Sequence, residues 1–321
     1  MKTRPPRILI ITPARADSNN GNWRTARRWA DLLSAKCRTA VTQSWQGEPC
    51  DGLIALHARR SARSISYWAE AGKPVPLALC LTGTDLYSDI GRDPDADRSL
   101  ELADRLVVLQ EDALQYIPVR HRSKTQVIYQ SSKSLSAAEK ASGQINCVMV
   151  GHIRHEKDPM TALRALKLLP PDAPVRIQHI GSALDQTLAA ELETEAAGEP
   201  RYHWTGPLPH GLTRAAIKRA HLLLHPSVME GGANVIVEAI TSGTPVLASE
   251  MSGNIGMLGK TYPGYFPVGD AAALAGLLMQ ALNDANFRAR LANACSARAK
   301  LFAPAEERRR LEALVFGLIS D

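Results

Sequence analysis

Short apolar runs of strand length recur along this chain, and segments of helix length separate them. Such runs occupy residues 7–12, 53–57, 77–81, 146–150 and 222–225. Strands that alternate with helices are typical of α/β architecture, in which helices cover a sheet of parallel strands. Because 321 residues are too many for one core of usual size, the pattern predicts two α/β domains of similar length.

A break in this pattern predicts the domain boundary. Residues 131–144 are rich in Ser, Lys and Ala and lack apolar periodicity, so we interpret them as a linker. The predicted N-terminal domain covers residues 1–135 and the C-terminal domain 145–303, and we expect a helix at about 304–321 to pack back on the first domain. Each domain is predicted to be a Rossmann-like, doubly wound parallel sheet. Two such domains that face each other leave a central cleft at the carboxyl ends of their strands, where ligands bind.

Composition excludes several classes of protein. The chain has no run of 18 apolar residues, and the run at 8–11 has the length of a strand, not of a signal peptide. We therefore expect a soluble, cytoplasmic protein with no membrane partner. The five cysteines are widely spaced and none forms a Cys-x-x-Cys pair. This spacing indicates neither a disulfide framework nor a zinc site.

The net charge of +6 is unevenly distributed. Residues 1–70 carry +7, whereas the remaining residues carry −1. A basic surplus in one part of a chain favours an anionic partner there, although a solvated basic face is the alternative for any single arginine. A nucleic-acid-binding protein is another alternative. Aromatic residues for stacking on bases make up only 5% of the chain, so we expect no nucleic-acid partner.

The segment 226–239 indicates a nucleotide-sugar site. It places Glu230 and Glu238, with seven residues between them, around a Gly-Gly turn that follows a predicted strand and begins a predicted helix. Small residues let the backbone approach a ligand, and free amides at a helix N-terminus attract an anion such as a diphosphate. The first carboxylate can then face a sugar and the second a ribose. The predicted binding residues here are Gly231, Gly232, Ala233, Asn234 and Glu238.

Two cations follow the first strand of the C-terminal domain. Arg154 and Lys157 lie three residues apart, so both can reach one bound diphosphate. Cations held beside a leaving diphosphate lower the barrier as its negative charge grows. Each cation alone would also fit a solvated helix start. Asp93, Asp95 and Asp97 are expected in a solvated loop, and we predict no metal site.

A second group of polar residues lies at predicted strand ends of the N-terminal domain, and these residues would suit a small, highly charged acceptor. His57 and Asp85 are the titratable candidates, because a histidine can take or give a proton near neutral pH. A structural role is the alternative for a single histidine at a strand end. The predicted acceptor-binding residues are Arg15, Asn20, Gly21, Arg59, Arg60, Thr82, Thr84 and Asp85.

The C-terminal half resembles the retaining, two-Rossmann-domain (GT-B) glycosyltransferases that carry Glu-x7-Glu. The resemblance implies that Arg154 and Lys157 bind the diphosphate of the donor and that Glu230 and Glu238 are the two glutamates of the motif. It also implies catalysis without a metal or other cofactor, since these enzymes use side-chain cations and helix dipoles. By the same resemblance we include His57 among the catalytic residues, with Glu230, Arg154 and Lys157.

The whole chain is similar to a narrower family, the selenosugar synthases of selenoneine biosynthesis. The similarity extends from residue 7 to about residue 311 and is carried by the runs 56–62, 81–87, 102–110, 230–235, 252–256 and 262–267. It implies that selenophosphate is joined to the sugar of a UDP-sugar, chiefly UDP-N-acetylglucosamine, with formation of a carbon–selenium bond and loss of UDP and phosphate. His57 could assist the loss of phosphate. A glycosyltransferase with an oxygen acceptor is the alternative, and the oligomeric state is not predicted.

Overall fold

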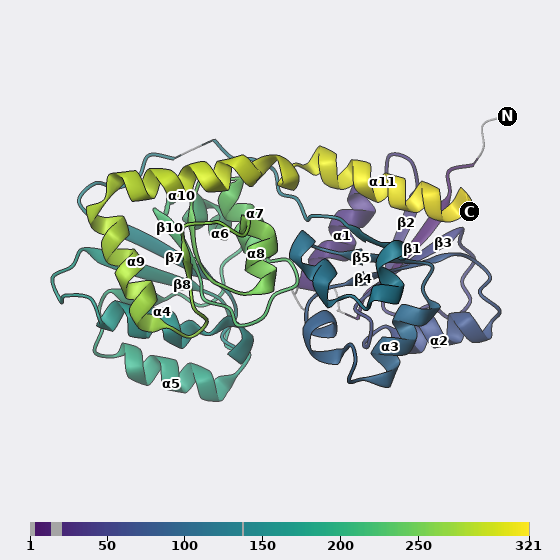
Figure 1. Cartoon of the computed structure of the whole chain (residues 1–321), viewed down its shortest axis with the longest axis horizontal. Coiled ribbons are helices and arrows are strands. Elements are labelled where there is room, and N and C mark those ends of the chain that lie inside the picture. Colours follow the sequence, from purple (N-terminus) through teal and green to yellow (C-terminus); the bar gives the residue numbers. More distant parts are fainter. Residues whose placement is uncertain (1–3, 14–20, 137, 321) are drawn as a thin grey trace. The chain divides into compact units, whose positions relative to one another are not determined.

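The computed structural model describes residues 4–13, 21–136 and 138–320, which form two compact units. The first unit comprises Met1–Ser131 and Ala303–Asp321, and the second comprises Ser132–Phe302 (Figure 1). Each unit contains one six-stranded sheet in which every pair of neighbouring strands is parallel. The predicted α/β class with two parallel sheets is therefore confirmed.

The sheet of the first unit has the strand order β2-β1-β3-β4-β5-β6. Its strands are β1 (Arg7–Ile11), β2 (Arg38–Thr42), β3 (Gly52–Leu56), β4 (Leu77–Leu81), β5 (Arg105–Val108) and β6 (Thr125–Val127). Its helices are α1 (Gly21–Leu33), α2 (Ala62–Glu70), α3 (Pro94–Leu102) and α11 (Pro304–Ser320), with the short turns η1 (Asp85–Asp89), η2 (Glu111–Tyr116) and η3 (Val119–Lys124).

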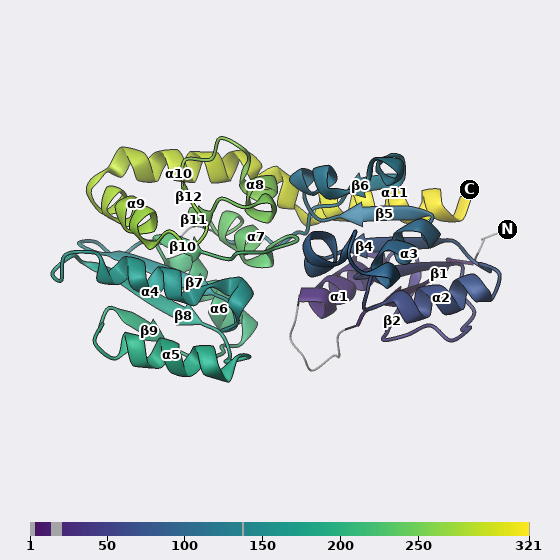
Figure 2. The same cartoon turned by 60° about the horizontal axis from the view of Figure 1, so that its bottom comes forward.

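Side chains that alternate along β1 supply the two faces of this sheet. Ile8 and Ile10 belong to a core that includes residues of α1 and α11, whereas Leu9 and Ile11 belong to a second core that includes residues of α2 and α3. Successive side chains of a strand point to opposite faces, and a parallel sheet is covered on both. Helices α1 and α11 accordingly lie together (Figure 1), and α2 lies beside α3 (Figure 2).

The sheet of the second unit has the strand order β12-β11-β10-β7-β8-β9. Its strands are β7 (Ile145–Val150), β8 (Val175–Ile180), β9 (Tyr202–Trp204), β10 (Leu222–His225), β11 (Val246–Ser249) and β12 (Tyr265–Phe266). Its helices are α4 (Pro159–Lys167), α5 (Gln186–Ala196), α6 (His210–Arg219), α7 (Asn234–Ile240), α8 (Ser252–Leu258), α9 (Ala271–Asn283) and α10 (Ala285–Arg298), with the turns η4 (His155–Lys157) and η5 (Ala299–Phe302).

Both strand orders contain a point at which the direction of winding reverses. In the first unit this point lies between β1 and β3, and in the second it lies between β7 and β10. In open α/β sheets, ligands bind outside the carboxyl ends of the strands at such a switch point. The loops that follow these four strands are therefore the places where a binding site is expected.

Parts of the local structure differ from what the sequence indicated. Strand β2 was not predicted, because its residues Arg38–Thr42 form an edge strand with half-exposed and exposed side chains instead of an apolar run. The aspartates 93–97 were expected in a loop but begin helix α3. Asp93 caps this helix by accepting hydrogen bonds from the amides of Asp95 and Ala96, with Pro94 in its first turn.

None of the helices in the part of the chain that the structure describes is both long and apolar enough to cross a membrane.

Candidate active site

Two loops meet at the switch point of the second unit. One leads from β7 to the turn η4, and the other leads from β10 to α7. The amide of Val228 donates a 3.0 Å hydrogen bond to the carbonyl of Glu156, which ties the loops together. Gly253 at the start of α8 completes this arrangement, since a Cβ atom there would lie 2.1 Å from the carbonyl oxygen of Glu230. Only glycine allows that approach.

An ion pair lies where these loops meet. Lys157 Nζ donates a short hydrogen bond to Glu230 Oε1, and both side chains are largely buried, with 15% and 11% of their surface exposed. Burial acts to raise the pKa of the Glu230 carboxyl, but Lys157, His225 and Ser227 together hold it below its ordinary value. Glu230 is therefore ionised at neutral pH.

The other predicted cation lies apart from this ion pair. The side chain of Arg154 is 43% exposed, and its Nε lies 3.8 Å from Glu156 Oε2. Asp158 follows Lys157 and is the N-cap residue of α4. Its carboxylate accepts hydrogen bonds from the amide and the hydroxyl of Thr161. The structure thus places Lys157 against Glu230, whereas the side chain of Arg154 is partly exposed and its Nε is buried without a hydrogen-bond partner.

Glu238 lies one turn into α7 and is largely buried. Its Oε1 is 2.8 Å from His210 Nε2 on α6, and its side chain is 9% exposed. At the start of α7, Ala233 is the N-cap residue and has no side-chain oxygen with which to cap the helix. Gly231 and Ala233 are buried, whereas Gly232 and Asn234 are half-buried.

In the first unit, His57 follows β3 with an unusual backbone. Its φ angle is 73°, in the left-handed region that residues other than glycine rarely adopt. Its Nδ1 accepts from the amide of Arg60 at 3.3 Å, and its Nε2 lies 3.0 Å from Thr84 Oγ1. Burial lowers the pKa of His57, although Asp85 acts against this effect. The imidazole is thus neutral, with its proton on Nε2 and donated to Thr84.

Asp85 connects the loops that follow β3 and β4. It is fully buried, and its carboxylate accepts from the amides of Ala58 at 2.9 Å, Thr82 at 2.9 Å and Gly83 at 2.8 Å. Both carboxylate oxygens therefore accept hydrogen bonds from the protein's own backbone. In the structure Asp85 holds the two loops together, and its predicted contact with the substrate stays a prediction.

The remaining predicted acceptor residues differ in exposure. Arg59 and Arg60 are exposed, and Arg59 Nε pairs with Asp89 Oδ2 at 3.2 Å. Thr82 and Thr84 are half-buried, and Gly21 is the exposed first residue of α1. Arg15 and Asn20 lie outside the described residues. The loops after β3 and β4 thus bring together His57, Thr82, Thr84 and Asp85.

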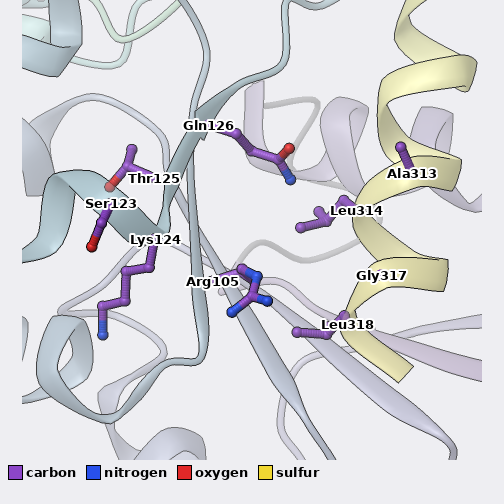
Figure 3. Close-up of a pocket in the computed structure, with 9 residues that line it drawn as sticks. All are labelled: Arg105, Ser123, Lys124, Thr125, Gln126, Ala313, Leu314, Gly317 and Leu318. Carbon is purple, nitrogen blue, oxygen red and sulfur yellow. The ribbon is translucent and has the colours of Figure 1, made fainter. Parts of the chain in front are cut away.

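A cavity of about 190 Å³ lies elsewhere in the first unit. Arg105 at the start of β5 and Gln126 of β6 line it together with Leu314 and Leu318 of α11 (Figure 3). It contains none of the predicted site residues. Because it lies at the amino-terminal end of β5, it is at the edge of the sheet opposite to the loops that carry His57 and Thr84.

Two histidines of the second unit were not among the predicted site residues. His225 ends β10 and its Nε2 lies 3.5 Å from Glu230 Oε1, while His210 contacts Glu238. A signal was present for His225, because a histidine follows three leucines five residues before Glu230. For His210 no local signal exists, since its contact is made across 28 residues of sequence.

The chemistry of these loops suits an anionic leaving group. Lys157 offers positive charge beside the ionised Glu230, and Arg154 lies on the same loop after β7, at the place where this type of sheet binds ligands. Among residues 4–13, 21–136 and 138–320, no group of three His, Cys, Asp or Glu residues is arranged to hold a metal ion.

Comparisons with known proteins identify the family. Residues 132–298 match the model of the family described as glycosyl transferases group 1. The chain is 24% identical over 276 residues to glycosyltransferase 1 domain-containing protein 1 of Xenopus tropicalis, covering 77% of this chain and 79% of that protein.

Two solved structures share the fold. Sucrose-phosphate synthase of Thermosynechococcus elongatus has a TM-score of 0.81 at 16% identity, covering 99% of this chain and 100% of that one. Anabaena HepE, solved with UDP and glucose, has a TM-score of 0.76 at 17% identity, covering 98% and 100%. At these identities the likeness shows the GT-B fold. With the family model matching more than half of its length, the chain belongs to the glycosyl transferases group 1 family.

Proposed function

We propose that this glycosyltransferase joins selenophosphate to the sugar of a UDP-sugar, UDP-N-acetylglucosamine, and thereby forms a selenosugar in selenoneine biosynthesis. The observation that carries the donor half is the buried pair of Lys157 and Glu230 at the switch point between β7 and β10. HepE, which shares the fold, was solved with UDP and with UDP-glucose. The sequence resemblance to selenosugar synthases supports the acceptor half.

In the proposed complex, the second unit holds the donor. Lys157 and Arg154 bind the diphosphate and stabilise the charge that grows on it. Glu238 accepts hydrogen bonds from the ribose, and Glu230 holds the sugar. The backbone of residues 231–234 lies against the phosphates, where glycines leave room for it. The side-chain cations supply the positive charge that a metal supplies elsewhere, so we propose that no cofactor is needed.

The acceptor is assigned to the loops after β3 and β4. Since the Nε2–H of His57 donates to the oxygen of Thr84, the hydroxyl hydrogen of Thr84 is left to point elsewhere. A half-buried hydroxyl held in this way is a donor suited to a phosphoryl oxygen. Arg59 and Arg60 add positive charge, and we assign Thr82, Gly21, Arg15 and Asn20 to the same acceptor. His57 thus orients a donor instead of removing a proton.

The proposed transfer of the sugar to selenophosphate does not require a general base. Selenophosphate is ionised at neutral pH, and its selenium supplies the electron pair for the bond to the anomeric carbon. The bond from that carbon to the UDP oxygen breaks, and UDP leaves with its electron pair. Water then attacks phosphorus, which releases phosphate and leaves the selenium on the sugar.

Product analysis tests this proposal. Purified protein is incubated with UDP-N-acetylglucosamine and selenophosphate, and UDP and the selenosugar are followed by mass spectrometry. Parallel reactions with thiophosphate, phosphate and simple sugars test other acceptors. Lys157→Met should abolish turnover, whereas Lys167→Met on the outer side of α4 should not, because that lysine is paired with Glu195 at 3.5 Å. If UDP release requires a sugar hydroxyl and does not increase with selenophosphate, the alternative of a glycosyltransferase with an oxygen acceptor is favoured.

A further inference from the structure

His225 is a buried polar residue whose position the donor site does not yet explain. It ends β10, a strand that is otherwise leucine and that lies between β7 and β11 in the sheet. Only 2% of its surface is exposed, and its Nε2 is buried without a hydrogen-bond partner. An unpaired buried donor or acceptor is costly, so a leucine would be the stabler choice there. The atom that Nε2 faces is Glu230 Oε1, 3.5 Å away.

The tautomer of this imidazole follows from what it faces. Burial lowers the pKa of His225 to about 4, with Glu230 acting against this effect and Lys157 adding to it, so the ring is neutral at pH 7. An ionised carboxylate can only accept hydrogen bonds. A neutral ring that faces it is stable with hydrogen on Nε2, whereas the other tautomer would set two acceptors against each other. His225 therefore presents an uncharged donor to Glu230.

The distance shows that this donor is not yet fully used. Hydrogen bonds from nitrogen to oxygen span about 2.7–3.2 Å, and the gap here is 3.5 Å. In this structure Oε1 is instead held by the ammonium of Lys157. A diphosphate in the donor site competes for that same ammonium. When Lys157 turns to the diphosphate, Glu230 loses its cation and can close a gap of about 0.5 Å to His225.

We propose that His225 is a positioning residue that takes over Glu230 from Lys157 when the donor binds, and keeps the carboxylate ionised and directed at the sugar. This inference rests on the proposed function, because it requires Lys157 to bind the diphosphate. The titratable groups that act on the carboxylate are Lys157 from the loop after β7 and His225 from β10.

Three substitutions at this position separate the roles of the two ring nitrogens. Gln places an amide nitrogen where Nε2 lies, Asn places one nearer to Nδ1, and Leu fills the space without a donor. With His225→Leu, the carboxylate in the donor complex should protonate at higher pH. We therefore expect the acid limb of kcat, measured with saturating UDP-N-acetylglucosamine, to move up by about one pH unit, so that turnover on that limb is up to about tenfold lower than in the wild-type protein.

The assay follows UDP release both with selenophosphate and with water alone, so that it does not depend on the acceptor. His225→Gln should restore the acid limb, and His225→Asn should behave like His225→Leu. A residue that only supported the fold would change stability in all three variants and leave the acid limb in place. Thermal unfolding of each variant is measured in parallel.

The outcomes separate this inference from the proposed function. A wild-type acid limb in His225→Leu, with UDP still bound, would overturn the role of His225 and leave the donor site standing. Undiminished UDP binding by Lys157→Met in calorimetry would overturn the donor site and this inference with it. So would a wild-type protein that neither binds UDP nor releases it from UDP-N-acetylglucosamine.

Discussion

Removal of the Lys157 ammonium should destabilise the second unit in a manner that depends on pH. The Lys157→Met variant keeps the length of the side chain but leaves the carboxylate of Glu230, 11% exposed, without its cation. Breaking one partner of a buried ion pair costs about 3 kcal/mol or more, because the remaining charge stays buried. For a unit of this size, that cost lowers the Tm by about 6–12 °C.

The sign of the pH dependence follows from the pKa of Glu230. In the wild-type protein this pKa is lowered, so the ion pair adds stability above the carboxyl's unfolded pKa and loses it as pH falls through the folded pKa. In the variant, burial acts without the opposing lysine and raises the pKa. The variant is then weakest at neutral pH, and its deficit relative to wild type shrinks as pH falls from 7 towards 4.

Scanning calorimetry at several pH values measures both effects, and a double variant isolates the pair. Lys157→Met/Glu230→Gln has no buried charge at this position, so it should lie within about 1 kcal/mol of the wild-type stability. Equal unfolding temperatures of Lys157→Met and the double variant at pH 7 would refute a stabilising role of this ion pair, and so would a deficit of Lys157→Met that does not change with pH.

The other predictions concern the acceptor loops, the first core and the need for a metal. Thr84→Val should raise the KM for selenophosphate about tenfold, because one hydrogen bond to an anion is lost. The KM for UDP-N-acetylglucosamine should stay constant in steady-state kinetics, and equal changes in both KM values would contradict the assignment of Thr84 to the acceptor. Glu307→Gln should destabilise the first unit by about 3 kcal/mol in urea unfolding. The reason is that this buried carboxylate binds Arg28, Trp29 and Ser131. An unchanged urea midpoint would show that these contacts of Glu307 do not stabilise the unit. EDTA should leave UDP release unaltered if Lys157 replaces a metal, and a loss that Mg²⁺ restores would count against that proposal.

Much of the fold could be predicted because the signals are local. Helix α9 was expected and found at residues 271–283, and strands β4, β8 and β10 were expected where they lie. Their apolar runs and flanking polar residues lie within one short segment. Strand β2 was not predicted, because an edge strand buries few side chains and its residues therefore need not be apolar. The start of α3 was not predicted, because three closely spaced aspartates are typical of a solvated loop. In the structure Asp93 is the N-cap residue of the helix.

The candidate site divides in the same way. The residues of the Glu-x7-Glu segment and the cations after β7 are adjacent in sequence, so their chemistry could be predicted without coordinates. Their roles in binding stay predictions until a ligand is bound. The protonation of His57 and the internal use of Asp85 could not be predicted, because both depend on burial and on amides supplied by other loops.

Local patterning along the chain was enough to establish which segments become strands, which become helices and which side chains carry charge at strand ends. Folding alone set Lys157 against Glu230, which are 73 residues apart in sequence, and put His225 within 3.5 Å of the same carboxylate. The reason is that β7 and β10 become neighbours only when the sheet forms. Burial at their carboxyl ends then shifts the proton equilibria of the groups that meet there.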